Sequence, residues 1–130
     1  MTAMRALIVD DSVLARAMLA RALKESGIPE IDQAEDGFEA IEKIRENAYD
    51  LILMDCNMPN MTGLDTVRTI RNEGKEMPII VVSCESDQRM VAEILSSGAN
   101  DYIVKPFEPK TISGILRKVL PDSSKQDRDL

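Results

Sequence analysis

Histidine is absent from this chain of 130 residues, and no other gap in its composition restricts its chemistry as much. The imidazole ring is the usual general base near neutral pH and the commonest metal ligand in proteins. A catalytic site built on a histidine base, a zinc site with histidine ligands and a phosphohistidine on this chain are therefore all excluded.

Cysteine, long apolar stretches and positive charge are also scarce. The two cysteines are too few for a disulfide scaffold. No apolar stretch is long enough to cross a membrane, and the first residues lack the apolar segment and cleavage site of a signal peptide. Lys and Arg total 16 against 23 Asp and Glu, and the net charge of -7 disfavours nucleic-acid binding. We therefore expect a cytoplasmic protein that binds neither nucleic acid nor a membrane.

Five short strand-like runs, each followed by a helical pattern, organise the chain. The runs are residues 6–9, 30–34, 51–54, 79–82 and 102–104. All of these runs except 30–34 are largely apolar, and apolar runs that alternate with amphipathic helices are typical of parallel strands buried on both faces. The sequence predicts an α/β fold with a doubly wound, five-stranded parallel sheet. It forms one domain over residues 1–121, and the polar segment 122–130 is expected to be a disordered tail.

The helical patterns also predict which side chains face the core. In the first helix, the apolar stripe consists of Ala15, Met18, Leu19, Ala22 and Leu23. Arg16 is expected on another face of that helix. In the helix at about residues 87–97, the stripe consists of Val91, Ile94 and Leu95.

Polar side chains stand where the apolar strands end. Asp10 and Asp11 follow the first strand, and Asp55 follows the third. Ser83 closes the fourth strand and Lys105 follows the fifth. In an open α/β sheet the carboxyl ends of the strands share one edge, where ligands bind. We therefore expect these side chains to lie close together.

This set of residue types predicts phosphoryl-transfer chemistry. Crowded carboxylates repel one another, and a hard divalent cation such as Mg²⁺ relieves that repulsion. A hydroxyl and an ammonium can bind phosphoryl oxygens, and a carboxylate can be the nucleophile that forms an aspartyl-phosphate. Asp55, which follows a buried strand and precedes a loop with Pro59 and Gly63, is the candidate nucleophile.

Each of these residues also has an ordinary structural explanation. Asp11 or Ser12 can cap the first helix, and Ser83 can cap the fourth. Lys105 can be a surface lysine, and Tyr102 can be a packing residue in the last strand. The occurrence of all these groups at successive strand ends is what favours a site.

The sequence resembles the receiver domain of two-component response regulators from about Arg5 to Leu120. The matching segments are Val9-Asp10-Asp11-Ser12, Glu35-Asp36-Gly37, Asp55 to Gly63, Ser83, Gly98-Ala99, Asp101-Tyr102 and Lys105-Pro106-Phe107. The loop at residues 57–61 is most similar to single-domain chemotaxis regulators of that family. The resemblance implies a flavodoxin-like (βα)5 fold with strand order 2-1-3-4-5.

The resemblance also implies a role for each site residue. Asp55 would accept a phosphoryl group from a histidine kinase. Asp11, Asp55 and the backbone carbonyl of Asn57 would ligate Mg²⁺ or Mn²⁺, with Asp10 acting mainly through water. The protein would catalyse only its own phosphorylation and dephosphorylation, and would not be an enzyme with a separate substrate.

Signal output follows from the same resemblance. Ser83 and Lys105 would bind the phosphoryl oxygens, and Ser83 and Tyr102 would shift together to alter the face formed by the fourth helix, fifth strand and fifth helix. That face would bind a downstream protein such as a flagellar motor switch protein, and the regulator is expected to be a monomer. The resemblance further implies a cis peptide bond between Lys105 and Pro106.

Other functions remain open at this point. A receiver can be a phosphorelay shuttle or a phosphate sink, or an interaction module alone. An aspartyl-nucleophile phosphatase of the haloacid-dehalogenase type is disfavoured because Asn57 stands where such enzymes carry a second Asp. A flavodoxin-like cofactor binder is disfavoured because no phosphate-binding loop rich in Gly or Thr follows the first strand.

The two cysteines flank the predicted site. Cys56 follows the candidate nucleophile, and Cys84 follows Ser83. They could form a redox pair, but we expect two buried, inert thiols.

Overall fold

The computed structural model describes residues 3–120. Five strands alternate with five helices, as predicted. The strands are β1 (Arg5–Val9), β2 (Glu30–Ala34), β3 (Leu51–Met54), β4 (Ile79–Ser83) and β5 (Asp101–Val104). The helices are α1 (Val13–Glu25), α2 (Gly37–Glu46), α3 (Gly63–Asn72), α4 (Gln88–Ser96) and α5 (Pro109–Val119). The predicted tail at residues 122–130 lies outside the described residues.

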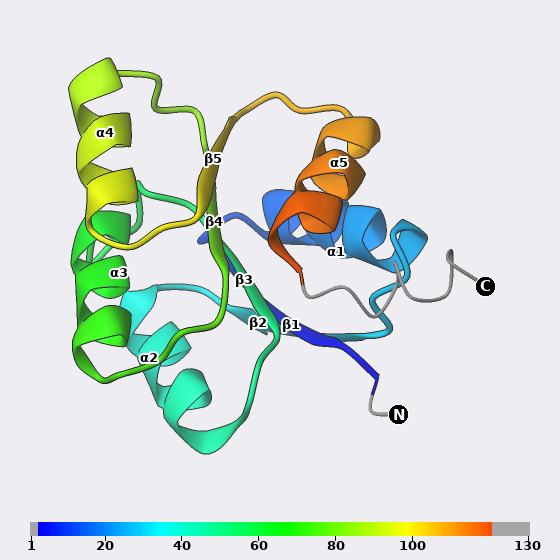
Figure 1. Ribbon diagram of the computed structural model, residues 1–130, viewed down its shortest axis with the longest axis horizontal. Coiled ribbons are helices and arrows are strands. Elements are labelled where there is room, and N and C mark those ends of the chain that lie inside the picture. Colours follow the sequence, from blue (N-terminus) through cyan, green and yellow to red (C-terminus); the bar gives the residue numbers. More distant parts are fainter. Residues whose placement is uncertain (1–2, 121–130) are drawn as a thin grey trace.

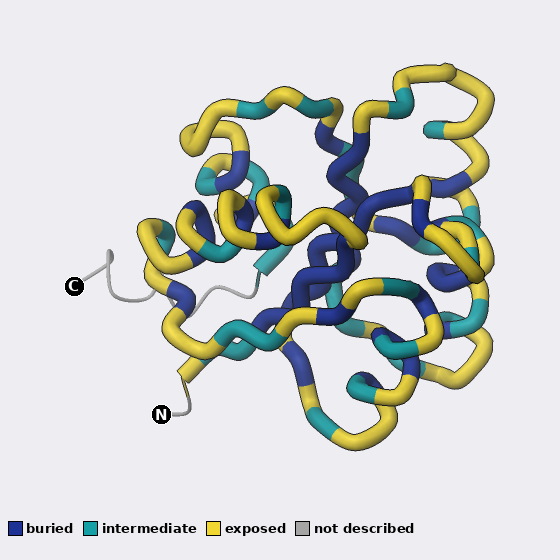
Figure 2. Tube along the Cα trace, turned by 180° about the vertical axis from the view of Figure 1, so that it is seen from behind, coloured by how far each residue is buried: buried dark blue, intermediate teal, exposed yellow. Residues whose placement is uncertain are grey.

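All five strands are parallel and lie in the order β2-β1-β3-β4-β5, as the resemblance implied. Helices α1 and α5 cover one face of this sheet, and α2, α3 and α4 cover the other (Figure 1). Each face buries its own apolar cluster. The central strands are therefore buried on both sides, while the helices carry most of the exposed residues (Figure 2).

Side chains at the helix starts fix where the helices begin. Ser12 accepts a hydrogen bond from the N–H of Ala15 and caps α1, so Ser12 and not Asp11 is the cap. Asp87 caps α4 in the same way. Ser83 is therefore not the cap of α4, and the ordinary explanation for that hydroxyl fails.

Three residues depart from the predicted helix faces. Met18 is 51% exposed and Leu95 is 38% exposed, although both were expected on the apolar stripes. Arg16 was expected on another face of α1 but is buried. The guanidinium of Arg16 donates to the backbone carbonyl of Asp10 at 2.7 Å and to the side chain of Gln33 at 2.9 Å. These polar partners make its burial favourable, and helical spacing alone does not reveal them.

The β3–α3 loop turns sharply back onto the end of β3. Asn60 has a positive φ of 70°, and its side chain donates to Asp36 at 3.2 Å. The N–H of Gly63 donates to the backbone carbonyl of Cys56 at 2.9 Å. A Cβ on Gly63 would lie 2.5 Å from the Cα of Cys56 and 2.8 Å from the backbone oxygen of Asp55. Only glycine therefore lets the start of α3 pack against the residues that end β3.

Among residues 3–120, no helix has both the length and the apolar character that a membrane crossing requires. The peptide bond between Lys105 and Pro106 is cis, as the resemblance implied.

We expect Gly63→Ala to destabilise the protein by about 1–3 kcal/mol, because the new Cβ meets backbone atoms that cannot move aside. Gly114→Ala is the matched control, since a Cβ there meets nothing within 4 Å inside α5. That change should stabilise the helix by about 0.5–1 kcal/mol. Urea denaturation measures both effects, and equal effects of the two substitutions would contradict the close-approach argument.

Candidate functional site

The sheet brings the predicted side chains to its carboxyl edge. Asp10 follows β1, Asp55 follows β3, Ser83 is the last residue of β4 and Lys105 follows β5. Strands β1 and β3 are neighbours and stay in register to their last residues. Asp10 and Asp55 therefore stand side by side, although 45 positions separate them in the sequence.

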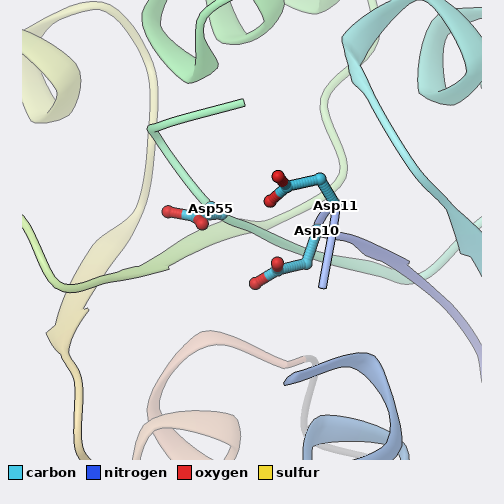
Figure 3. A group of neighbouring side chains, drawn as sticks. All are labelled: Asp10, Asp11 and Asp55. Atoms are coloured by element: carbon cyan, nitrogen blue, oxygen red, sulfur yellow. The ribbon is translucent and has the colours of Figure 1, made fainter. Parts of the chain in front are cut away.

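Three carboxylates form an acidic cluster at this edge. Carboxylate oxygens of Asp10, Asp11 and Asp55 all lie within 4.8 Å of one another (Figure 3). Asp10 is 1% exposed and Asp55 is 9% exposed, whereas Asp11 lies at the surface. Oxygen donors from several carboxylates, partly open to solvent, are the ligand set that suits a hard divalent cation. The residues present therefore fit such a cation.

Lys105 supplies the positive charge nearest to this cluster. Its ammonium nitrogen lies 2.7 Å from Oδ2 of Asp10 and 3.7 Å from Oδ2 of Asp55. Burial by itself lowers the pKa of Lys105, but the hydrogen bond to Asp10 and the charges of Asp55 and Asp10 outweigh it and raise that pKa above its ordinary value. Lys105 is thus a fixed cation that contacts two of the three acids.

The backbone around Asp10 holds its carboxylate in place. Oδ1 of Asp10 accepts the N–H of Ser12 at 2.9 Å, and its carbonyl accepts from the buried Arg16. The N–H of Asp10 donates to the carbonyl of Ala34 at 3.1 Å. Three hydrogen bonds, to its carboxylate, its carbonyl and its N–H, therefore hold Asp10 in place without any ligand. The sequence alone did not predict that Arg16 bonds the backbone of Asp10. The only feature of the sequence that pointed to this contact is that an arginine lies one turn into the helix that follows the acidic pair.

Asn57 lies next to the cluster. Its backbone N–H donates to Oδ1 of Asp55 at 3.2 Å, so the loop bends around the Asp55 carboxylate. The side chain of Asn57 is exposed.

Ser83 and Tyr102 belong to a second, neighbouring group of polar atoms. The buried hydroxyl of Ser83 accepts from the thiol of Cys56 at 3.0 Å and from the N–H of Glu85 at 3.3 Å. The hydroxyl of Tyr102 donates to the carbonyl of Glu85 and lies 3.6 Å from the same thiol. The pKa of Tyr102 is raised, mainly because the phenol is buried and secondly because it contacts Cys56. The phenol therefore stays protonated at neutral pH. Sequence reasoning gave Cys56 no part in this group.

The expectation of two buried thiols is half right. Cys56 is buried, but Cys84 is exposed, and neither is in a disulfide. Ser83 is the last residue of β4 and is buried like the rest of that strand, whereas Cys84 lies one residue beyond the strand end, where the helices no longer cover the chain.

A parallel α/β sheet with an acidic cluster, a hydroxyl and a lysine at its carboxyl edge defines the class of open α/β domains whose polar site lies at the strand ends. A family model described as the response regulator receiver domain matches residues 6–117. The chain belongs to this receiver-domain family.

The relatives of this chain include chemotaxis proteins. The chain is 40% identical over 115 residues to the chemotaxis protein CheY of Thermotoga maritima, covering 88% of this chain and 96% of that protein. It is 41% identical over 120 residues to the chemotaxis protein CheY1 of Helicobacter pylori, covering 90% and 97%.

Solved structures confirm the fold, and they include both response regulators and a receiver domain that belongs to a histidine kinase. The chemotaxis response regulator CheY4 of Vibrio cholerae superimposes with a TM-score of 0.83 at 36% identity, covering 92% of this chain and 100% of that one. The signal receiver domain of a histidine kinase from Syntrophus aciditrophicus gives 0.81 at 30% identity, covering 91% and 90%. The fold therefore serves both free regulators and kinase-attached receivers.

We expect Asp11→Asn to stabilise the folded protein by up to about 1 kcal/mol at low ionic strength, because it removes one of three mutually repelling charges. The gain should shrink as NaCl rises, since salt screens the exposed Asp11. Urea midpoints measured in EDTA at two salt concentrations test this. Glu76→Gln removes an exposed charge outside the cluster and serves as the control. A loss of stability in Asp11→Asn would contradict the repulsion argument.

Proposed function

We propose that this protein is the phospho-accepting switch of a two-component system, and that Asp55 is the phosphoacceptor. The observation that carries the proposal is the ammonium of Lys105, which reaches Asp55 and Asp10 across the acidic cluster. A surface lysine with no role at the site would have no need to contact two acids that follow other strands. A carboxylate between further acids and one cation is suited to receive a phosphoryl group.

The proposed reaction needs few residues. An oxygen of Asp55 attacks the phosphorus of a phosphohistidine on a kinase, the P–N bond breaks, and the leaving imidazole takes up a proton. Asp11, Asp55 and the carbonyl of Asn57 would hold Mg²⁺ or Mn²⁺, and Asp10 would act mainly through water. That cation, when bound, neutralises charge on the carboxylates and on the phosphoryl oxygens. Lys105 and Ser83 bind phosphoryl oxygens as ammonium and hydroxyl donors.

The protein in this proposal catalyses its own phosphorylation and dephosphorylation and acts on no separate substrate. Its signal leaves through the face formed by α4, β5 and α5, where Met90 and Leu95 of α4 and Val104 of β5 are exposed apolar side chains. Such exposed apolar groups suit a protein partner. The named relatives support a role in chemotaxis, with a flagellar motor switch protein as the kind of target, and a monomer in the cytoplasm as the working form.

Asp55→Asn should abolish phosphorylation by acetyl phosphate, because the amide cannot form an acyl phosphate. Intact mass spectrometry of the wild-type protein should show one added phosphoryl group with Mg²⁺, and none after EDTA. Asp65→Asn changes an exposed aspartate in the first turn of α3 and should be labelled like the wild type. Stable labelling of Asp55→Asn, or labelling that a chelator does not affect, would refute the assignment.

Lys105→Ala should fold but fail to switch, because the ammonium contacts the acids of the site and contributes nothing to either apolar cluster. Beryllofluoride with Mg²⁺ serves as the phosphate mimic, and backbone NMR shifts report the response. In the wild type we expect shifts at the site and on α4, β5 and α5. In Lys105→Ala the distant shifts should disappear while thermal melting stays cooperative. Normal distant shifts together with a large loss of stability would make Lys105 a structural residue.

A further inference from the structure

Cys56 is a buried polar side chain that the proposed phosphoryl transfer does not use. It follows Asp55 directly, is 5% exposed and belongs to the apolar cluster on the side of α2, α3 and α4. Despite that apolar setting, its sulfur contacts two hydroxyls, those of Ser83 and Tyr102. It lies between the residue proposed to sense the phosphoryl group and the aromatic proposed to respond.

The hydrogen atoms in this group can be counted. The Tyr102 hydroxyl has one hydrogen, which it donates to the carbonyl of Glu85. The close contact between Tyr102 and the thiol therefore has only the thiol hydrogen to use. That hydrogen has two oxygen neighbours, Ser83 at 3.0 Å and Tyr102 at 3.6 Å, and the shorter contact is the one it makes here.

The same count applies to Ser83. Its hydroxyl oxygen accepts from Cys56 and from the N–H of Glu85, and these contacts use both acceptor positions. The Ser83 hydroxyl then has only its own hydrogen left to offer. A phosphoryl oxygen needs a donor of this kind. If the Ser83 oxygen moves toward a phosphoryl group on Asp55 to make that bond, it leaves its two present partners.

We propose that Cys56 is a positioning residue that couples Ser83 to Tyr102, with its S–H bonding Ser83 in this structure and Tyr102 once Ser83 turns to a phosphoryl group on Asp55. This inference rests on the proposed function, because it needs a phosphoryl group at Asp55. No bond other than hydrogen bonds forms or breaks. The thiol keeps its single hydrogen throughout and changes only its acceptor, so the position of Tyr102 beside the thiol gains a bond when Ser83 leaves.

Two other roles for this thiol make different predictions. A thiol that only fills space would be replaced without effect by any small side chain. A redox partner of Cys84 would lose its function in any variant without sulfur. The proposed coupling needs a hydrogen-bonding group of similar size, and serine supplies one.

The test uses the two tyrosines of the chain as internal reporters. The protein is labelled with fluorotyrosine, so that ¹⁹F NMR gives one resonance for Tyr102 and one for Tyr49. Tyr49 bonds Asp32, a residue of β2, and serves as the reference signal. Beryllofluoride with Mg²⁺ is titrated into the wild type, Cys56→Ala, Cys56→Ser and Cys84→Ala. The last variant makes the same thiol-to-methyl change at the exposed cysteine.

In the wild type, the mimic should shift the Tyr102 resonance and leave Tyr49 unmoved. One hydrogen bond of this kind changes a conformational equilibrium by about twofold to fivefold. In Cys56→Ala the resting state and the bound state each lose one hydrogen bond, so the apparent Kd for the mimic should stay within about twofold of the wild type. The shift of Tyr102 at saturation should fall to about half, because Ser83 no longer acts on Tyr102 through the thiol. Cys56→Ser should restore the shift, and Cys84→Ala should match the wild type.

The outcomes separate this inference from the function on which it rests. A wild-type protein whose Tyr102 does not respond to the mimic would overturn the proposed function and the coupling with it. A wild-type response that is unchanged in Cys56→Ala would overturn the coupling alone and leave the phosphoacceptor role intact. A defect shared by Cys56→Ala and Cys56→Ser would also overturn it, in favour of a role for sulfur itself. Cys56→Ser keeps a polar side chain of similar size, so it remains informative even if the alanine variant folds poorly.

Discussion

The crowding of three carboxylates at one edge of the sheet is the constraint on which this structure depends. Asp10, Asp11 and Asp55 come within 4.8 Å of one another, and two of them are buried. Like charges so close destabilise a fold unless other groups offset them. Lys105 does so from the end of β5, and the backbone bonds around Asp10 hold one carboxylate in place. The protein thus keeps like charges close together at one edge of the sheet, where a divalent cation would relieve their repulsion.

The rest of the fold makes this arrangement possible. The order β2-β1-β3-β4-β5 makes β1 and β3 neighbours, so residues that follow them must meet. Helices on both faces bury the central strands and leave only the carboxyl edge for polar groups. The β3–α3 loop folds back through Gly63 onto Cys56, which keeps the end of β3 from moving independently of α3. The close approach at Gly63 and the strand order therefore both determine where the residues that follow β3 lie.

Two kinds of polar interaction meet at the end of β3. Asp55 faces the acids and the lysine, where full charges act over several ångströms. Cys56 faces Ser83 and Tyr102, where neutral hydrogen bonds act only at contact distance. Adjacent positions in the chain thus join a charged site to a network of neutral donors and acceptors. This proximity gives a physical route from a charge change at Asp55 to an aromatic side chain on β5.

The sequence by itself determined the element order and the four strand ends that carry polar site residues, and it predicted the chemistry of the site. It could do so because apolar periodicity and strand-end polarity are local properties that each segment carries alone. It did not determine that Arg16 would be buried, that Cys84 would be exposed, or that Cys56 would contact Ser83 and Tyr102. Those facts depend on partners from other strands, and a hydrogen bond between distant residues exists only once the sheet has placed both of its atoms within about 3 Å.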